Sequence, residues 1–415
     1  MSRDVVVIGG GVIGAACAYY LSKSGWTVTI LDMGEFGKGC SHANCGFVCP
    51  SHVLPLAGPG AIRTAIKALV NPNGPLRIKP SFDPTLWSWL FRFARRCNER
   101  DMLAAGHAIQ PLLNSSRALY PQIVEEEKID CEWEARGLLF VFQTKPAFEH
   151  YAETHKLLSD SFQMPAKRFI GDELSQLEPA LKLGLAGGYL YETDAHVRPD
   201  KLMSGWKRVL ENRGVTIREN CPVESVLREA DRAKAVVTAR GEIAADDFVF
   251  AAGALTPLLG STLGCRLPIQ PGKGYSITMD RPAHCPAIPL IFEEHRVAAT
   301  PMQSGYRLGS TMEFAGYDAT LNPKRLDLLR DGAKPYLHEP LGEPVREEWF
   351  GWRPMTSDGL PIIGPVPGLG NAWVAAGHNM LGLSMATATG KLVAEMLGAG
   401  KPHLDPAPYS LKRFA

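Results

Sequence analysis

The stretch DVVVIGGGVIGAACAYYLSKSGWTVTILD, residues 4–32, contains a strand, a turn, a helix and a second strand in succession. Val5–Ile8 is a continuous apolar run rich in β-branched residues, which predicts a strand buried on both faces. Helical spacing follows over Ala15–Ser24, and Thr27–Leu31 is predicted to be the second strand, which ends at Asp32. The order predicts the first β-α-β unit of an α/β fold.

Three glycines separate the first strand from the helix, in the spacing Gly-x-Gly-x-x-Gly. The first permits a tight turn, the second lets a pyrophosphate approach the backbone at the positive helix N-terminus, and the third lets the helix pack against the strand. An acidic residue at the end of the second strand can accept hydrogen bonds from a ribose hydroxyl. The pattern predicts a dinucleotide site, but it does not separate FAD from NAD. The residues assigned to this site are Gly9, Gly11, Val12, Ile13, Gly14, Asp32 and Met33.

The composition sets limits on the class of protein. A chain of 415 residues suits two domains, or one domain with a large insertion. Its 44 basic and 43 acidic residues leave a net charge of +1, so nothing indicates a nucleic-acid partner. The nine cysteines are an odd number without regular disulfide spacing, and the glycine-rich run at the N-terminus does not look like a secretion signal. We therefore expect a reducing, cytoplasmic compartment.

The rest of the chain alternates between segments typical of a nucleotide-binding domain and segments of a second domain. Two or more helices are predicted over Pro84–Glu127 and another over Pro199–Asn212, with a strand over residues 133–143 between them. A buried strand at Phe248–Ala252 and a C-terminal strand, glycine-rich turn and helix return to the nucleotide-binding type. We therefore expect a discontinuous nucleotide-binding domain over residues 1–55, 185–264 and 351–415, and a second domain over residues 56–184 and 265–350.

A thiol-rich segment, GCSHANCGFVCPSH at residues 39–52, allows several interpretations. Three cysteines and two histidines could hold a metal ion or an iron–sulfur cluster, and a pair of the thiols could form a disulfide. No second cysteine cluster accompanies them, and free cysteine also behaves as a small hydrophobic residue that fills tight positions. We expect no metal here.

Four further motifs occur in a fixed order: SHANCGFVCP (41–50), GKGYSIT (272–278), GWRPMTSDGLPIIG (351–364) and AAGHNMLGLSMATATG (375–390). Together with the N-terminal glycines, they resemble the FAD-dependent D-amino-acid oxidase superfamily, and its bacterial D-amino-acid dehydrogenases in particular. The resemblance covers essentially the whole chain. It implies a Rossmann-like FAD-binding domain and a substrate domain built from a mixed β-sheet and helices.

The resemblance also implies which residues surround the cofactor. The 41–50 loop would run along the flavin side of the pyrophosphate, the backbone of residue 223 would recognise adenine, and the loop at 377–384 would reach the flavin edge. Covalent attachment of flavin needs a suitably placed cysteine or histidine. Sarcosine oxidases of the superfamily carry a cysteine in a C-terminal motif, and none follows Cys285 here, so FAD is expected to bind noncovalently. The residues assigned are Ser41, His42, Asn44, Gly46, Phe47, Val223, Gly253, His378, Leu381, Gly382, Leu383 and Ser384.

Two residues are predicted to hold the substrate. Arg353 lies in the family's Gly-x-Arg-Pro motif, where the arginine binds the substrate carboxylate, and a guanidinium can make two parallel hydrogen bonds to such a group. Tyr275 lies where related tyrosines help to bind the carboxylate. The alternatives are a salt-bridged arginine beside a proline turn and a packed strand tyrosine.

The implied reaction is oxidative deamination of D-amino acids by hydride transfer from Cα to flavin N5, with D-proline or hydroxy-D-proline as cyclic candidates. Electrons would pass to a quinone or another carrier. A glycine- or sarcosine-type oxidase that uses oxygen is an alternative, although Met380 stands where glycine oxidase has an arginine. A flavin-binding electron-transfer subunit is another.

The segment TLWSWLFRFARRCNER, residues 85–100, interleaves aromatic and basic residues. It predicts an amphipathic helix that covers the second domain, or one that contacts a membrane surface. The second interpretation would place the protein peripherally on the inner face of the cell membrane.

Overall fold

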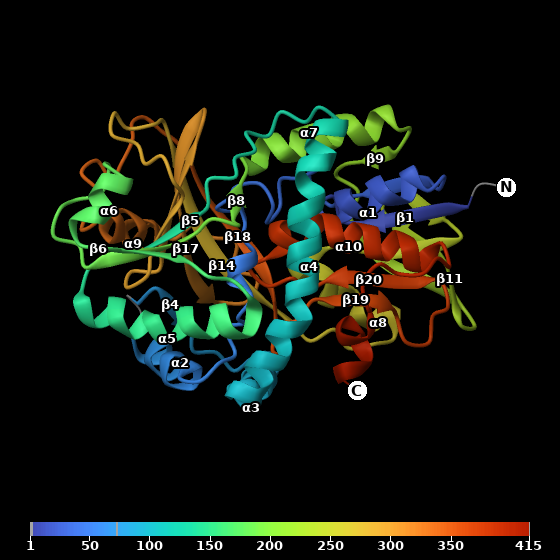
Figure 1. Ribbon diagram of the computed structural model, residues 1–415. Coiled ribbons are helices and arrows are strands. Elements are labelled where there is room, and N and C mark those ends of the chain that lie inside the picture. Colours follow the sequence, from blue (N-terminus) through green and yellow to red (C-terminus); the bar gives the residue numbers. More distant parts are fainter. Residues whose placement is uncertain (1–2, 72–73, 415) are drawn as a thin grey trace.

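The computed structural model describes residues 3–71 and 74–414. Within these residues the strands form a six-stranded sheet, a nine-stranded sheet and two small sheets of three and two strands. The two large sheets occupy opposite halves of the molecule in Figure 1, with both chain ends in the half of the six-stranded sheet. Helix α4 (Glu99–Glu126) runs across the middle and packs on α10 (Gly382–Leu397). The predicted α/β class is confirmed.

The six-stranded sheet carries the glycine-rich turn. Its strands are β1 (Asp4–Ile8), β2 (Thr27–Leu31), β9 (Thr216–Arg218), β13 (Asp247–Phe250), β19 (Ile362–Pro365) and β20 (Ala372–Ala376). The order is β19-β20-β13-β1-β2-β9, and β1 pairs in parallel with β13 and β2. Both faces are covered, which explains why β1 is apolar from Val5 to Ile8, after the exposed Asp4. Val5 and Val7 pack in the cluster that contains α10 and α1 (Val12–Lys23), whereas Val6 and Ile8 pack in a cluster on the other face.

The two small sheets and several short helices border this half. The three-stranded sheet consists of β10 (Val223–Glu229), β11 (Arg232–Thr238) and β12 (Gly241–Ala244), and the two-stranded sheet of β3 (Phe47–Val48) and β8 (Ala195–His196). The helices here are α7 (Pro199–Asn212), α8 (Gly260–Leu263) and the 3-10 turns η1 (Pro50–His52), η2 (Gly253–Leu259), η3 (Ala407–Tyr409) and η4 (Leu411–Phe414).

The nine-stranded sheet forms the other half. Its strands are β4 (Leu76–Ile78), β5 (Leu138–Phe142), β6 (Lys167–Ile170), β7 (Gly187–Tyr191), β14 (Ile269–Met279), β15 (Leu290–Phe292), β16 (Val297–Met302), β17 (Gly305–Phe314) and β18 (Val345–Thr356). The order is β18-β14-β17-β16-β15-β5-β7-β6, with β4 paired to β17. Helix α9 (Pro323–Ala333) packs on one face through Leu326 and Leu329, in a cluster with Tyr275 and Ile277 of β14.

The other helices of this half are α2 (Ala61–Val70), α3 (Pro84–Arg96), α5 (Lys145–Phe162) and α6 (Asp172–Leu177). Helices α2 and α3 pack together through a separate apolar cluster that includes Ala68, Leu86 and Trp89. Helix α3 starts at Pro84 after Asp83, whose carboxylate caps the N–H of Thr85.

Most predicted elements occur with small changes of boundary. Helix α7 has the predicted bounds, and the predicted helical stretch 84–127 is divided because Asn98 caps a new helix at the Asp101 N–H. The strand predicted around residues 133–143 is shorter, since Trp133 lies outside β5. The predicted domain boundaries stay a prediction. The boundary at residue 185 leaves β7 with the nucleotide-binding part, although β7 pairs inside the nine-stranded sheet.

Candidate functional site

The loop at residues 41–47 joins the two halves of the molecule. On one side, the Ser41 hydroxyl accepts a hydrogen bond from the Val12 N–H at the start of α1. On the other, Ser276 of β14 donates to the carbonyl of Ala43 at 2.7 Å, and buried Arg307 of β17 donates to the carbonyl of Asn44 at 2.8 Å. Residues from four distant parts of the chain are thereby brought to one place, which is the candidate site.

The glycine-rich turn has the predicted geometry. Gly9 has φ +109°, and a Cβ there would lie 2.6 Å from the carbonyl oxygen of Ala251. A Cβ on Gly14 would overlap the carbonyl oxygen of Gly9. Helix α1 begins at Val12 with no acidic residue in its first turn. Its N-terminus therefore has the positive end of the helix dipole and backbone donors available to an anion such as a pyrophosphate.

Asp32 lies beside this turn at the end of β2. One carboxylate oxygen accepts from the Gly10 N–H at 2.6 Å and the other from the Gly34 N–H at 2.8 Å. Each carboxylate oxygen can accept a further hydrogen bond, so the predicted contact with a ribose hydroxyl fits this geometry. Met33 follows as an exposed side chain.

Two further residues assigned to the cofactor, Val223 and Gly253, begin or follow other strands of this half. The Cys221 N–H donates to the carbonyl of Asp32 at 2.8 Å, and Val223 begins β10 two residues later as a half-buried side chain. Gly253 follows β13 with φ +56° and has open space where a side chain would be. Both positions fit the sequence assignment.

Within the 41–47 loop, the predicted residues Asn44 and Gly46 shape the backbone turn. The Asn44 side chain accepts from the Gly46 N–H at 2.7 Å, and a Cβ on Gly46 would overlap the carbonyl oxygen of Val197. His42 points elsewhere: its Nε2 lies 2.9 Å from a carboxylate oxygen of Glu347 on β18. That hydrogen bond lowers the pKa of Glu347. Sequence reasoning missed Glu347, because it lies four residues before the motif that begins at Gly351.

The three thiols of this region contact different partners. Cys45 packs against Gly309 of β17, where a Cβ would lie 2.7 Å from the sulfur, whereas the Cys49 sulfur lies 3.5 Å from the Ser384 hydroxyl. Burial raises the pKa of Cys40 to about 11 and also raises the pKa values of Cys45 and Cys49. Protonated thiols are poor metal ligands. No group of three potential ligands suits a metal ion within residues 3–71 and 74–414.

The C-terminal loop closes the site from the side of β20. Gly377 has φ +76°, and a Cβ there would lie 2.7 Å from the Thr356 side chain. His378 is buried, and its Nε2 lies 3.1 Å from the Thr389 hydroxyl. Burial lowers the pKa of His378 to about 3, so the ring is neutral at physiological pH.

The start of α10 follows this loop directly. Leu381 occupies the N-cap position, and Gly382 and Leu383 open the helix without an acidic residue in the first turn. The Ser384 hydroxyl donates to the carbonyl of Phe47 at 2.9 Å and accepts from the Cys49 N–H at 3.2 Å. These bonds place the helix N-terminus beside the 41–47 loop, where it favours negative charge.

Arg353 extends from β18 toward the same region. Its guanidinium lies over Gly274 of β14, where any Cβ would overlap it, and it donates to the carbonyl of Thr311 at 2.8 Å and of Ser310 at 3.4 Å. Two of its five N–H donors are used in these bonds. The side chain is partly exposed, and no acidic partner is recorded for it within the described residues. It therefore retains donors for a carboxylate.

A bulge in β17 makes this arrangement possible. Tyr275 pairs with Ser310 and Lys273 with Glu313, so the register shifts between them. Ser310 and Thr311 have φ values of +106° and +46°, an uncommon backbone conformation for such residues. Their carbonyl groups thereby turn toward the guanidinium of Arg353. The buried Thr311 hydroxyl has no hydrogen-bond partner among the described residues. Sequence patterns give no signal for a bulge of this kind.

Tyr275 does not join Arg353. Side chains alternate between the faces of a strand, so Gly272, Gly274 and Ser276 face the site whereas Tyr275 faces α9. Its hydroxyl donates to Glu313 at 2.8 Å, and its side chain is buried. The predicted contact of Tyr275 with a substrate carboxylate is therefore not supported by its position, because the strand period turns it away.

Comparisons with known proteins agree with this geometry. The family described as "FAD dependent oxidoreductase" matches residues 4–396. The chain is 34% identical over 406 residues to a D-amino acid dehydrogenase of Paramagnetospirillum magneticum, covering 96% of this chain and 95% of the relative. It is 35% identical over 425 residues to a D-amino acid dehydrogenase of Xanthobacter autotrophicus, covering 99% of each.

Solved structures share the fold. Glycine oxidase from Geobacillus kaustophilus superimposes with a TM-score of 0.79 and 24% identity over 99% of both chains. L-proline dehydrogenase from P. horikoshii superimposes with a TM-score of 0.73 and 20% identity, covering all of this chain and 98% of that one. At these identities the structures indicate a common fold only.

Proposed function

Because this chain belongs to the family of FAD-dependent oxidoreductases, we propose that it is a dehydrogenase that oxidises D-amino acids and passes the electrons to a quinone or another carrier. Family membership confirms the predicted resemblance, the enzyme class and FAD as the cofactor. It also decides between FAD and NAD, which the glycine spacing alone did not. The substrate and its configuration follow the names of the relatives and belong to the proposal.

The observation that carries the proposal is the half-buried side chain of Arg353, whose guanidinium is bonded only to two backbone carbonyls among the described residues and keeps donors for a carboxylate. An α-amino acid has one carboxylate next to the carbon that is oxidised, and a guanidinium fork binds a carboxylate in a fixed orientation. The carbonyl groups of Ser310 and Thr311 hold the guanidinium from behind.

The chain's own residues would prepare the cofactor end of the site. Bound FAD supplies the acceptor for the hydride that leaves Cα. The first N–H groups of α10 and its dipole favour the negative charge that builds up on reduction. The turn at Gly9–Gly14 and the Ser41 hydroxyl would hold the pyrophosphate. We propose noncovalent binding because His378 is buried and bonded to Thr389, and because no cysteine follows Cys285.

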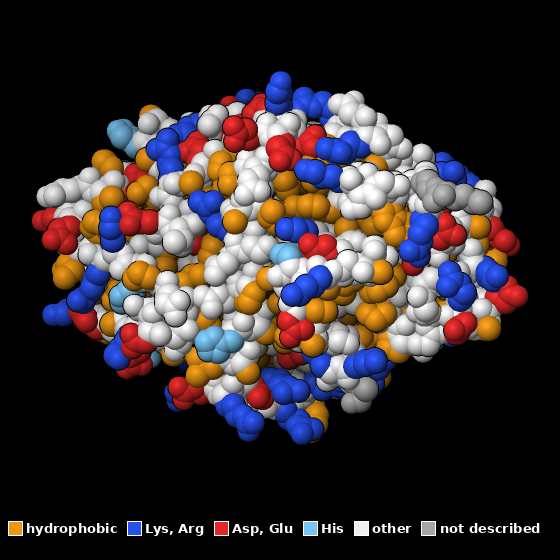
Figure 2. Space-filling model, turned by 45° about the vertical axis from the view of Figure 1, so that its right-hand side comes forward, with side chains coloured by type: hydrophobic (Ala, Val, Ile, Leu, Met, Phe, Trp, Pro, Cys, Tyr) orange, Lys and Arg blue, Asp and Glu red, His pale blue; other side chains and the backbone are white. Residues whose placement is uncertain are grey.

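A surface on α2 and α3 supports a peripheral membrane contact. Ile62 and Ile66 are exposed on α2, Trp87 and Phe91 are exposed on α3, and Phe82 is fully exposed before α3; we call these five residues the α2–α3 surface. Residues 56–98 contain seven lysines and arginines and one acid, in a chain of net charge +1. Figure 2 shows basic and hydrophobic side chains together along the lower edge, the level at which α3 lies in Figure 1.

Apolar side chains beside basic ones suit the headgroup region of an anionic bilayer. No helix in the described part of the chain is long and apolar enough to cross a membrane. All nine cysteines carry free thiols, which supports a reducing compartment and hence the inner face of the cell membrane.

The first test is an anaerobic titration of the purified holoenzyme with D- and L-amino acids, glycine, sarcosine and both prolines and hydroxyprolines, followed by the visible absorbance of the flavin. We expect bleaching by D-amino acids and restoration of the colour by a soluble quinone. Bleaching by glycine or sarcosine, with hydrogen peroxide formed in air, would support the oxidase alternative. A flavin that no amino acid bleaches would support an electron-transfer subunit.

The membrane contact is tested by co-sedimentation with phosphatidylglycerol vesicles and with neutral phosphatidylcholine vesicles. The double variant Trp87→Ser/Phe91→Ser should lose most binding to the anionic vesicles. Leu183→Ser is the matched control, because Leu183 is exposed outside the α2–α3 surface. Equal binding of the wild type and the double variant would contradict this contact.

A further inference from the structure

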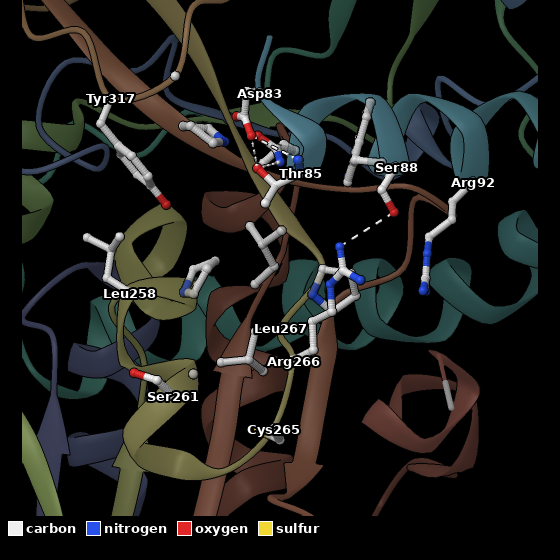
Figure 3. A pocket seen from close by; sticks show the side chains of 18 of the residues that line it. Asp83, Thr85, Ser88, Arg92, Leu258, Ser261, Cys265, Arg266, Leu267 and Tyr317 are labelled. Atoms are coloured by element: carbon white, nitrogen blue, oxygen red, sulfur yellow. Dashed lines mark hydrogen bonds between the residues drawn. The ribbon is translucent and has the colours of Figure 1, made fainter.

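A pocket of about 600 Å³ lies between α3, the segment 257–268 and the start of β14. Figure 3 shows Arg92 and Arg266 on one side of it and Tyr317 and Leu258 on the opposite side. It contains none of the residues assigned to FAD or to the substrate carboxylate. It is therefore a separate cavity with its own lining.

The lining combines apolar walls with two arginines and one acid, Asp83, whose carboxylate accepts a hydrogen bond from the Thr85 N–H at 2.8 Å. Trp89, Leu258, Leu267, Ile269 and Tyr317 provide aromatic and aliphatic surface. The Arg266 guanidinium has a single long hydrogen bond, 3.5 Å to the Ser88 hydroxyl, and the Arg92 guanidinium has no recorded hydrogen bond or ion pair within residues 3–71 and 74–414. Such a pocket suits a flat apolar ring with oxygen atoms that accept hydrogen bonds from guanidinium groups.

The pocket adjoins the flavin side of the candidate site. Ile269 lines the pocket, and its side chain lies 3.5 Å from where a Cβ on Gly377 would be, in the loop assigned to the flavin edge. The indole N–H of Trp89 donates to the carbonyl of Met355 at 3.0 Å, two residues after Arg353. The Tyr317 hydroxyl donates to the carbonyl of Ala254 at 2.8 Å, next to Gly253. The pocket thus borders the loop assigned to the flavin edge at Ile269, and it borders segments next to other assigned site residues at Trp89 and Tyr317.

We propose that this pocket binds the ring of a quinone, which is the electron acceptor of the enzyme. The proposal rests on the proposed dehydrogenase function, which needs an acceptor other than the amino acid. The quinone takes up two electrons from reduced FAD and two protons, from reduced FAD and solvent, and leaves as the hydroquinone, while FAD is reoxidised. Arg92 and Arg266 would donate hydrogen bonds to a quinone oxygen and stabilise the negative charge that develops there.

The position of the pocket on α3 suits an acceptor dissolved in a membrane. Ser88 and Arg92 line the pocket, and the exposed side chains of Trp87 and Phe91 lie on the same helix. A membrane contact through α3 would therefore bring the pocket near the lipid, so that a quinone could enter it from the bilayer.

The test uses a short-chain, water-soluble benzoquinone and the FAD-loaded enzyme without lipid. Binding to the oxidised enzyme is measured by isothermal titration calorimetry. Reoxidation is measured by anaerobic stopped flow after reduction of the flavin with dithionite, so that the result does not depend on any amino-acid substrate. Arg92→Leu removes an unpaired guanidinium from the pocket, and Ser88→Trp fills it from a half-exposed position on α3. Arg95→Leu is the matched control, since Arg95 is exposed on α3 outside the pocket.

We expect Arg92→Leu to weaken quinone binding by about tenfold or more, because a charge-assisted hydrogen bond is lost. Ser88→Trp should weaken it at least as much, because the indole occupies the space of the quinone ring, and both variants should slow reoxidation by the quinone. Reoxidation by ferricyanide and the FAD content should not change, and Arg95→Leu should behave as the wild type. Unchanged quinone binding in both pocket variants would overturn the proposal. So would binding of benzoate but not of the quinone, which would identify an anion site. If amino acids fail to reduce the flavin while the quinone results hold, the proposed substrate is wrong and the acceptor site remains.

Discussion

The two large sheets contribute to the site in different ways. The six-stranded sheet contributes loops at the carboxyl ends of its strands, such as the turn at Gly9–Gly14 and the loop at Gly377. The nine-stranded sheet contributes the face of two long paired strands, β14 and β18, where Gly274 lies under Arg353. The loop residues can be recognised from a contiguous sequence motif, whereas a strand face depends on register and on the neighbouring strand. We expect substitutions at the loop glycines to have the largest effects, because an added Cβ there overlaps neighbouring backbone or side-chain atoms.

The largest effect is expected for Gly14→Ala. The added Cβ would overlap the carbonyl oxygen of Gly9, so the turn and the start of α1 cannot both keep their places. We expect little folded protein and an FAD content of about a tenth of that of the wild type or less. The ratio of flavin to protein absorbance measures this. Gly370→Ala is the control, because a Cβ at that exposed glycine would lie 3.8 Å from the carbonyl oxygen of Asp231, an ordinary contact. A normal FAD content in Gly14→Ala would refute the assignment of this turn to the cofactor.

A smaller, purely kinetic effect is expected for Arg353→Lys on the strand face. Lysine keeps the positive charge but loses the planar pair of donors, so the carboxylate is held less tightly. The value of kcat/KM for a D-amino acid should fall roughly 10- to 150-fold, the equivalent of about 1.5–3 kcal/mol. Steady-state kinetics with a soluble quinone measure it. FAD content should stay normal, and a variant as active as the wild type would exclude Arg353 as the carboxylate anchor.

Tyr275→Phe tests whether the face of β14 that carries Tyr275 contributes to stability and not to substrate binding. The variant removes the hydrogen bond to Glu313, which keeps its ion pair with Arg77 at 2.9 Å. The free energy of unfolding should fall by about 1–3 kcal/mol. The KM for the amino acid should stay the same, because Tyr275 lies on the face opposite Arg353. Denaturant unfolding and kinetics on the same samples test this. A raised KM with unchanged stability would restore Tyr275 as a substrate ligand.

The smallest effect concerns His378 in the C-terminal loop. Its pKa is about 3 in the folded protein and near 6.5 when unfolded. Below pH 6.5 the unfolded chain therefore binds a proton that the folded protein does not, and stability falls as the pH decreases toward 3. His378→Gln should reduce this slope by at most one proton, about 1.4 kcal/mol per pH unit. Urea unfolding between pH 4.5 and 7 measures the difference. Identical slopes would show that the ring titrates normally.

The sequence by itself determined the elements whose signals are local. Apolar strands, three glycines at a fixed spacing and an acid at the strand end predicted β1, α1, β2 and the site at the carboxyl ends of the two strands. The ordered motifs predicted the family and FAD. They also placed Arg353, because a short motif keeps its residues together wherever the chain folds.

Only the tertiary structure decided which residues face one another across strands and helices. Tyr275 is one residue from Gly274 in the sequence but faces α9, because side chains alternate along a strand. The carbonyls of Ser310 and Thr311 reach Arg353 through a bulge, and Glu347 reaches His42 across 305 positions of the chain. The pocket at Arg92 and Arg266 joins segments about 170 residues apart along the chain. Such pairings depend on register and packing between distant strands and helices, which a local pattern does not encode.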